Sequence, residues 1–162
     1  MSFTADFRIG HGYDVHRLDE KRELFLGGVK IPASKGCVAH SDGDVLIHAI
    51  CDALLGAANL GDIGKHFPDD DPQYKNISST ILLNKVLEIL NDNKFAINNI
   101  DSTICLQKPK ISPFIESIQS NLANILKIET VSVKATTTEK LGFIGKEEGI
   151  AAYAVALIRK VE

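Results

Sequence analysis

The sequence has no apolar run that approaches the roughly 20 residues needed to cross a bilayer, so no membrane-spanning segment is expected. Residues 1–8 have no apolar signal core, and no secretory leader is visible there. The three cysteines, Cys37, Cys51 and Cys105, are far apart and form no CxxC pair, which is poor material for a disulfide framework. These absences favour a protein of the reducing cytosol.

The net charge and the chain length give no reason to expect a nucleic-acid-binding protein or a protein of several domains. The net charge of −3 gives no electrostatic reason to expect a nucleic acid as partner. No low-complexity tract, internal repeat or Pro/Gly linker divides the 162 residues, a length typical of one domain with its own core. We therefore expect a single domain over residues 1–162, with neither nucleic-acid nor membrane partners.

Candidate strands and helices alternate along the chain. Apolar patterns predict strands at 7–16, 24–31, 97–106, 129–135 and 150–158, and helices at 45–58, 78–90 and 112–126. Ser41 and Asp42 are N-cap candidates for the first helix, and a Gly-rich loop is expected at 142–149. Such interleaving indicates an α/β fold, and we expect an α+β arrangement in which helices pack on one face of a mixed sheet. The last strand is apolar on both faces, which is typical of a buried central strand or a subunit interface.

Two side chains of the first strand, with one from the first helix, form a candidate metal site. Residues at i and i+2 on a strand face the same way, so Asp14 and His16 can bind one ion, and His48 could supply a third ligand. Two nitrogens and one oxygen suit zinc, and three protein ligands leave one position open, which indicates a catalytic site. Asp44 and Asp52 lie one turn either side of His48 and could bind its second ring nitrogen.

The same residues also permit a structural interpretation. An Asp-x-His pattern on a strand is common and is often structural or on the surface. His48 stands in a helix rich in Ala, Leu and Ile, where a buried histidine with satisfied hydrogen bonds is equally possible. Spacing alone leaves both interpretations open, and it specifies no substrate.

Several polar segments could bind phosphate or nucleotide. KATTTEKLGF places three threonines at the end of a predicted strand, and Glu139 beside them could hold Mg²⁺ together with phosphate oxygens. QKPKIS puts Lys108 and Lys110 around Pro109 and could hold a nucleotide, while Asp62 could bind sugar hydroxyls. Taken alone, each segment is more commonly explained by solvated charges on an ordinary strand end or turn.

Taken together, four segments closely resemble the 2-C-methyl-D-erythritol 2,4-cyclodiphosphate synthase family. They are RIGHGYDVHRL, LGGVKIP, KGCVAHSDGDVLIHAICDALLGAANLGDIGKHFPDDDP and VKATTTEKLGFIGKEEGIA, and they occur in the family's order. The resemblance runs from about residue 8 to the C-terminus and is weakest over 74–126.

The resemblance implies an activity in the non-mevalonate pathway of isoprenoid (terpenoid) precursor synthesis. It implies that 4-diphosphocytidyl-2-C-methyl-D-erythritol 2-phosphate is cyclised to 2-C-methyl-D-erythritol 2,4-cyclodiphosphate with release of CMP, as by a phosphorus–oxygen lyase. It also implies a homotrimer with active sites at the subunit interfaces. Each site would use zinc and Mg²⁺ (or Mn²⁺). The expected location is the bacterial cytoplasm, or a plastid if a transit peptide was removed.

The resemblance also assigns roles to individual residues. Zinc would bind Asp14, His16 and His48, magnesium would bind Glu139, and His40 with Thr137 would stabilise the transition state. Substrate contacts are expected from Ser41, Asp62, Ile63, Gly64, Phe67, Asp69, Asp71, Leu106, Pro109, Lys110, Ile111, Ser112, Thr136, Thr138, Phe143 and Lys146.

The same residues are compatible with two rival functions. A zinc-dependent phosphohydrolase would cleave a nucleotide diphosphate with water and give open-chain phosphates. A non-catalytic module that binds a nucleotide or an isoprenoid diphosphate would bind tightly without turnover. The products of one reaction mixture would distinguish all three.

Overall fold

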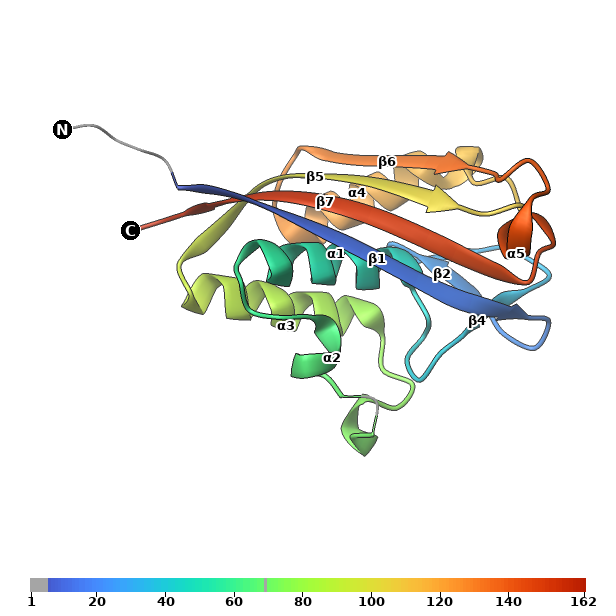
Figure 1. Cartoon of the computed structure of the whole chain (residues 1–162), viewed down its shortest axis with the longest axis horizontal. Helices are drawn as coiled ribbons and strands as arrows, with labels where there is room; N and C mark the ends of the chain where they lie inside the picture. Colours follow the sequence, from blue (N-terminus) through green and yellow to red (C-terminus); the bar gives the residue numbers. More distant parts are fainter. Residues whose placement is uncertain (1–5, 69) are drawn as a thin grey trace.

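A computed structural model describes residues 6–68 and 70–162 of the chain. Its centre is a five-stranded sheet in the order β4-β1-β7-β5-β6. The strands are β1 (Phe7–Asp19), β4 (Gly36–Val38), β5 (Phe95–Cys105), β6 (Val131–Thr136) and β7 (Gly149–Lys160). Only the β5–β6 pair of this sheet is parallel, so the sheet is mixed, as expected. The long strand β7 lies between β1 and β5, which confirms the predicted central strand (Figure 1).

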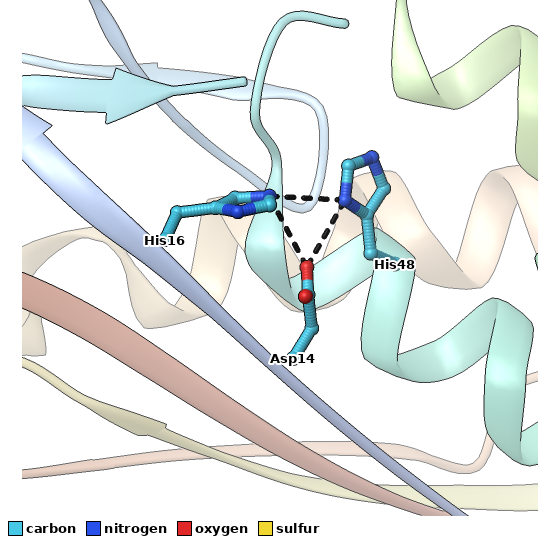
Figure 2. A group of neighbouring side chains, drawn as sticks. All are labelled: Asp14, His16 and His48. Carbon is cyan, nitrogen blue, oxygen red and sulfur yellow. Dashed lines mark hydrogen bonds and ion pairs between the residues drawn. The ribbon is translucent and has the colours of Figure 1, made fainter. Parts of the chain in front are cut away.

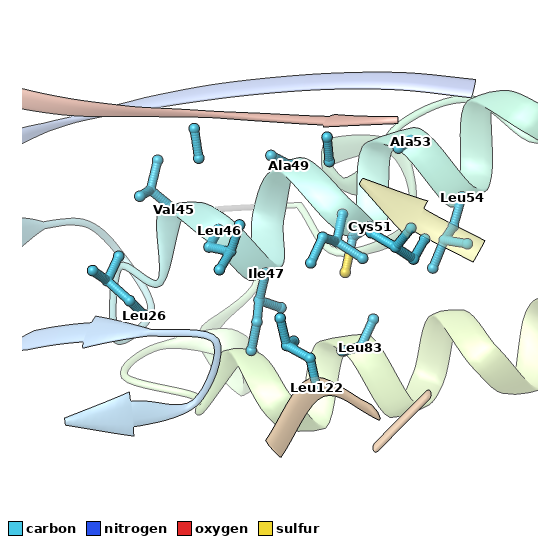
Figure 3. Close-up of a cluster of buried hydrophobic side chains, with 14 of the residues drawn as sticks. Leu26, Val45, Leu46, Ile47, Ala49, Cys51, Ala53, Leu54, Leu83 and Leu122 are labelled. Atoms are coloured by element: carbon cyan, nitrogen blue, oxygen red, sulfur yellow. The ribbon is translucent and has the colours of Figure 1, made fainter. Parts of the chain in front are cut away.

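The principal helices cover one face of the sheet. They are α1 (Val45–Ala57), α3 (Ser79–Asp92) and α4 (Ile115–Leu126), and they pack on the sheet and on one another (Figure 1). Their apolar faces bury a continuous core, in which Cys51 behaves as a small hydrophobe among Leu46, Leu54 and Leu83 (Figure 3). The expected single-domain α/β fold with helices on one face is therefore confirmed. No helix in the described ranges is both long and apolar enough to cross a membrane.

Several short elements differ from the sequence-based expectation. The expected strand at 24–31 is instead a hairpin of β2 (Leu24–Leu26) and β3 (Val29–Ile31), because Gly27 and Gly28 turn the chain with φ of +59° and +78°. The expected helix at 112–126 begins with a 3₁₀ turn, Ser112–Phe114. Short helices occur at α2 (Ile63–His66) and Pro72–Tyr74, for which no helix was predicted, and α5 (Gly142–Gly145) lies within the expected loop at 142–149.

The N-cap of α1 also differs from expectation. The cap is Asp44, whose carboxylate accepts hydrogen bonds from the backbone N–H groups of Ile47, Gly27 and Gly28 at 3.0, 3.0 and 2.7 Å. Asp42 instead binds the N-terminus of α3, because its Oδ2 accepts from Ser79 N at 2.9 Å. Both aspartates therefore join α1 to neighbouring segments.

A glycine seam brings α1 into backbone contact with β1. A Cβ placed on Gly10 would lie 1.8 Å from Ala53 O, and one on Gly12 would lie 1.8 Å from Ala49 O. No side chain fits between strand and helix at these points, so glycine is required at both positions of β1. The seam sets the separation between the β1 side chain Asp14 and the α1 side chain His48.

Candidate metal centre and substrate cavity

Asp14, His16 and His48 converge at the end of the glycine seam. Asp14 and His16 come from the inner face of β1, and His48 comes from the first turn of α1 (Figure 2). Asp14 Oδ2 lies 3.0 Å from His48 Nδ1 and 3.2 Å from His16 Nε2, and the two ring nitrogens lie 3.1 Å apart. The structure thus brings together the three residues predicted as metal ligands.

The geometry of this triangle fits a bound cation. Ligands at about 2.0–2.1 Å from a tetrahedral zinc ion lie roughly 3.3 Å from one another, close to the 3.0–3.2 Å seen here. Hydrogen bonds alone cannot satisfy the triangle. Asp14 only accepts, and each neutral ring nitrogen either donates or accepts, so every arrangement of protons leaves two like groups facing each other. A cation accepts all three lone pairs at once.

The electrostatic surroundings of His48 also favour positive charge. Its side chain is only 12% exposed, and this burial, the largest single influence, lowers its pKa. The hydrogen bond and the charge of Asp14, together with the charges of Asp44 and Asp42, outweigh burial and raise the pKa of His48 above its ordinary value of 6.5. The same negative field would stabilise a divalent metal ion.

The prediction that a carboxylate of α1 binds the second ring nitrogen of His48 is wrong. The Asp44 carboxylate accepts hydrogen bonds at the N-cap of α1, and Asp52 Oδ1 accepts from Ile63 N at 2.8 Å. His48 Nε2 instead faces two hydroxyl groups, Ser79 Oγ at 2.9 Å and Ser41 Oγ at 3.2 Å. The outer contacts of this histidine therefore come from α3 and from the loop before α1.

The metal-binding triangle opens into a cavity of about 360 Å³. His40 lies in its wall, and among the described residues His40 Nε2 is buried without a hydrogen-bond partner. A buried ring nitrogen without a partner is costly, so this atom indicates a ligand group in the cavity. Of the predicted substrate contacts, the lining includes Ser41, Ile63, Gly64 and Phe67.

Sequence reasoning missed part of the cavity wall. Tyr74, Ile77 and Leu82 form an apolar side, and Asp52 contributes a half-buried carboxyl group. Burial is the main cause that raises the pKa of Asp52, and the charges of Asp62 and Asp14 add to it. The residues from 74 to 82 belong to the region where the family resemblance was weakest, so neither pattern nor motif could place them.

A second, shallower pocket of about 220 Å³ lies where β5 and β6 end. It gathers a whole group of predicted substrate contacts, namely Leu106, Pro109, Lys110, Ile111, Ser112, Thr136 and Thr137. Next to it, Thr137 Oγ1 donates to Glu139 Oε1 at 3.1 Å and accepts from Glu139 N at 3.2 Å. Glu139 and Lys140 have positive φ of 52° and 66°, a left-handed conformation that is costly for side-chain-bearing residues and often marks functional sites.

The remaining predicted contacts lie outside the linings of both pockets. Asp62 caps α2 by accepting from Lys65 N at 2.9 Å, and Asp71 caps the 3₁₀ turn by accepting from Gln73 N at 3.0 Å. Thr138 Oγ1 donates to Leu141 O at 2.6 Å. Phe143 and Lys146 lie in and directly after α5, and both are exposed. Asp69 falls outside the described residues.

A larger groove of about 510 Å³ lies elsewhere, between the ends of α3 and α4 and the start of β5. Its wall is mainly aliphatic, with Leu87, Ile97 and Ile128, and the metal-binding triangle is not part of it. The chemistry of the donor groups therefore favours the smaller cavity as the functional site.

A family model described as the YgbB family matches residues 7–159. The chain belongs to the YgbB family. A relative from Thioalkalivibrio sulfidiphilus, 2-C-methyl-D-erythritol 2,4-cyclodiphosphate synthase, is 60% identical over 95% of this chain and 98% of its own. A protein of the same name from Pelotomaculum thermopropionicum is 61% identical over 94% and 96% of the two chains. The family resemblance drawn from the motifs is confirmed.

Solved structures of YgbB-like chains show the same fold. The bifunctional IspDF of Campylobacter jejuni superposes with a TM-score of 0.94 at 43% identity, and the match covers 98% of this chain but only 44% of that longer protein. The Plasmodium falciparum IspF CDP complex gives a TM-score of 0.84 at 37% identity, with 97% and 98% of the two chains covered. Relatives with this fold thus include one whose structure was solved as a complex with a cytidine nucleotide.

Proposed function

We propose that this chain is a metal-dependent cyclase that converts 4-diphosphocytidyl-2-C-methyl-D-erythritol 2-phosphate into 2-C-methyl-D-erythritol 2,4-cyclodiphosphate and CMP. The observation that carries the proposal is the metal-binding triangle in a cavity that also contains the unpartnered His40 Nε2. The names of close relatives support the substrate, and the CDP complexes of similar chains support its cytidine end.

Two cations would act together with the protein. Asp14, His16 and His48 would hold Zn²⁺, and Glu139 would hold Mg²⁺ or Mn²⁺ with the substrate's phosphates. When bound, these ions supply Lewis-acid stabilisation of negatively charged phosphate oxygens.

The residues around the cations have the task of holding two anionic phosphates in line. The second pKa of a phosphate monoester is about 6, so the attacking 2-phosphate is already ionised near neutral pH and needs no general base. His40 Nε2 would donate to a phosphate oxygen, and Thr137 would orient the β-phosphorus from the other side. Positioning and charge stabilisation dominate phosphoryl transfer, which is what these groups provide.

The nucleotide end of the substrate would occupy the second pocket. There Lys110 would neutralise diphosphate charge, while Leu106, Ile111 and the Pro109 turn would contact the cytosine. Glu139 borders this pocket through its contact with Thr137, so its carboxylate would be available to hold a cation that supplies positive charge to the substrate's phosphates.

The metal cavity and the nucleotide pocket share no lining residue and are therefore separate. The proposed substrate has a polyol phosphate at one end and a nucleotide at the other, so it would need both pockets. We propose that a homotrimer joins the metal cavity of one chain to the nucleotide pocket of the next. The outer face of the sheet supports this, because it exposes a patch of apolar side chains. Its members are Phe7, Ile9, Tyr13 and Val15 on β1 and Tyr153 and Val155 on β7. Patches of this kind commonly mark protein interfaces.

Phosphorus NMR of one reaction tests the activity. Incubation with substrate, zinc and magnesium should give free CMP and a cyclic diphosphate. Open-chain phosphates instead would identify the rival phosphohydrolase, and unchanged substrate with tight binding would identify a binding module. Either result would refute the cyclase.

A further inference from the structure

The outer nitrogen of His48 is held by a chain of groups that no metal-site spacing predicts. His48 Nε2 lies 2.9 Å from the hydroxyl of Ser79, the first residue of α3, and Ser79 is fully buried. The same hydroxyl donates a hydrogen bond to Asp42 Oδ1. Ser79 thus lies between the imidazole and a carboxylate.

The direction of this chain follows from its chemistry. A carboxylate can only accept, so the single hydroxyl hydrogen of Ser79 points to Asp42. The Ser79 oxygen must then accept from His48, which places a hydrogen on Nε2. With a cation among Asp14, His16 and His48, an imidazole that carries its hydrogen on Nε2 presents its Nδ1 lone pair to that cation.

Asp42 is itself fixed by backbone donors. Its Oδ2 accepts from Ser79 N at 2.9 Å, and its Oδ1 accepts from Asp44 N at 3.1 Å. The carboxylate is therefore tied to the first backbone N–H of α3 and to the start of α1, so it cannot easily turn away from Ser79.

Ser41 does not provide the same constraint. Its hydroxyl lies farther from His48 Nε2, at 3.2 Å, and it accepts from Gly43 N at 3.2 Å. No carboxylate is seen to take its hydrogen among the described residues, so this hydroxyl can either donate or accept.

We propose that Asp42 and Ser79 are positioning residues that hold His48 in the Nε2–H tautomer and so aim its Nδ1 lone pair at the metal. Outer partners that fix a ligating histidine are usually carboxylates or carbonyls in direct contact with the ring. Here a serine hydroxyl passes the orienting effect of the carboxylate to the ring. The inference rests on the proposed metal site and adds the residues that orient it.

Zinc affinity tests the role of Ser79. Metal-free full-length protein is titrated with zinc against a chelating indicator, for the wild type and for Ser79→Ala. Loss of an outer partner typically weakens metal binding by about 10–100-fold, and we expect that range for Ser79→Ala. Ser78→Ala is the matched control, because its hydroxyl contacts Thr80 Oγ1 at 2.8 Å and makes no cap bond to α3.

Nitrogen-15 NMR of the histidine rings tests the tautomer directly. In zinc-bound wild-type protein, the His48 ring should carry its hydrogen on Nε2, and this hydrogen should exchange slowly with solvent because it is held by the buried Ser79. In Ser79→Ala this hydrogen should exchange faster, while Ser79→Thr, which keeps the hydroxyl, should restore both the slow exchange and the zinc affinity. The wild-type spectrum needs no variant to fold.

The outcomes separate this inference from the metal site itself. A wild-type chain that binds no zinc would refute the proposed ligands. Zinc bound by the wild type with an affinity that Ser79→Ala shares would refute the role of Ser79 alone. A zinc-bound wild type whose Nε2 hydrogen on His48 exchanges as fast as in Ser79→Ala would also refute it.

Discussion

Replacing Gly12 by alanine should disrupt the metal centre without touching a ligand. The new Cβ would lie 1.8 Å from Ala49 O and 2.8 Å from Ala49 C, whereas real Cβ contacts stay beyond 3.0 Å. Strand and helix must therefore separate by about 1.2 Å at this point. Gly12 and Asp14 lie on the same face of β1, and His48 precedes Ala49, so the separation moves one ligand away from the other two.

The size of the effect follows from this displacement. Metal–ligand distances tolerate roughly 0.2 Å, so a shift of about 1.2 Å removes His48 from the coordination sphere. Zinc affinity should fall at least about 100-fold, since loss of a mere outer partner already costs about 10–100-fold. Forced expansion of a packed core costs roughly 1–3 kcal/mol, and backbone rather than a flexible side chain must move here, so we expect about 3 kcal/mol of lost stability.

Zinc competition titration and urea unfolding measure the two effects. Gly56→Ala is the control, because Gly56 lies in α1 and a Cβ there meets nothing within 4 Å. That change should leave zinc affinity intact and add up to about 1 kcal/mol of stability through helix propensity. Wild-type zinc affinity in Gly12→Ala would refute the view that the seam sets the ligand geometry.

Further predictions concern the second metal, the nucleotide, the helix cap and the assembly. Glu139→Gln should raise the Mg²⁺ concentration needed for half-maximal turnover, and an unchanged requirement would remove Glu139 from that site. Lys110→Ala should weaken CMP binding in calorimetry, and unaltered affinity would move the nucleotide pocket elsewhere. Asp44→Ala should cost on the order of 3 kcal/mol in urea unfolding, because three backbone N–H groups lose their acceptor; a cost below 1 kcal/mol would contradict this. Ile9→Asp, at a side chain 74% exposed on the sheet face, should lower the mass in analytical ultracentrifugation yet leave zinc binding intact, and an unchanged mass would place the interface elsewhere.

The sequence predicted the long elements well because each carries a long, distinctive apolar pattern. The central strand β7 was recognisable because small and β-branched residues occur on both of its faces. Helix α1 was recognisable because most of its own residues are apolar. The hairpin at 24–31 was missed since its two strands are only three residues each, too short for a two-residue glycine turn to stand out. The cap of α1 was misplaced because Ser41, Asp42 and Asp44 are all good cap residues by type. Which of them caps depends on the contacts of the β2–β3 turn and of α3.

The candidate site was predictable in its ligands and not in its surroundings. Asp14, His16 and His48 followed from strand and helix periodicity together with the family resemblance. The hydroxyl of Ser79 stands 31 positions from His48, so no local spacing could pair them. The apolar wall at Tyr74 and Leu82 depends on how α3 packs against α1, which is a tertiary property.

The glycine seam also explains why three candidate ligands at suitable spacing could not by themselves distinguish a metal site from an ordinary Asp-x-His strand. A strand and a helix that pack through larger side chains lie about 10 Å apart, too far for Asp14 and His48 to share one ion. Gly10 and Gly12 remove the side chains that would keep them apart, and Ala49 and Ala53 do the same from the helix. The metal-binding geometry is thus specified as much by residues that have almost no side chain as by the ligands. Variation at the four seam positions should change metal affinity before it changes the fold.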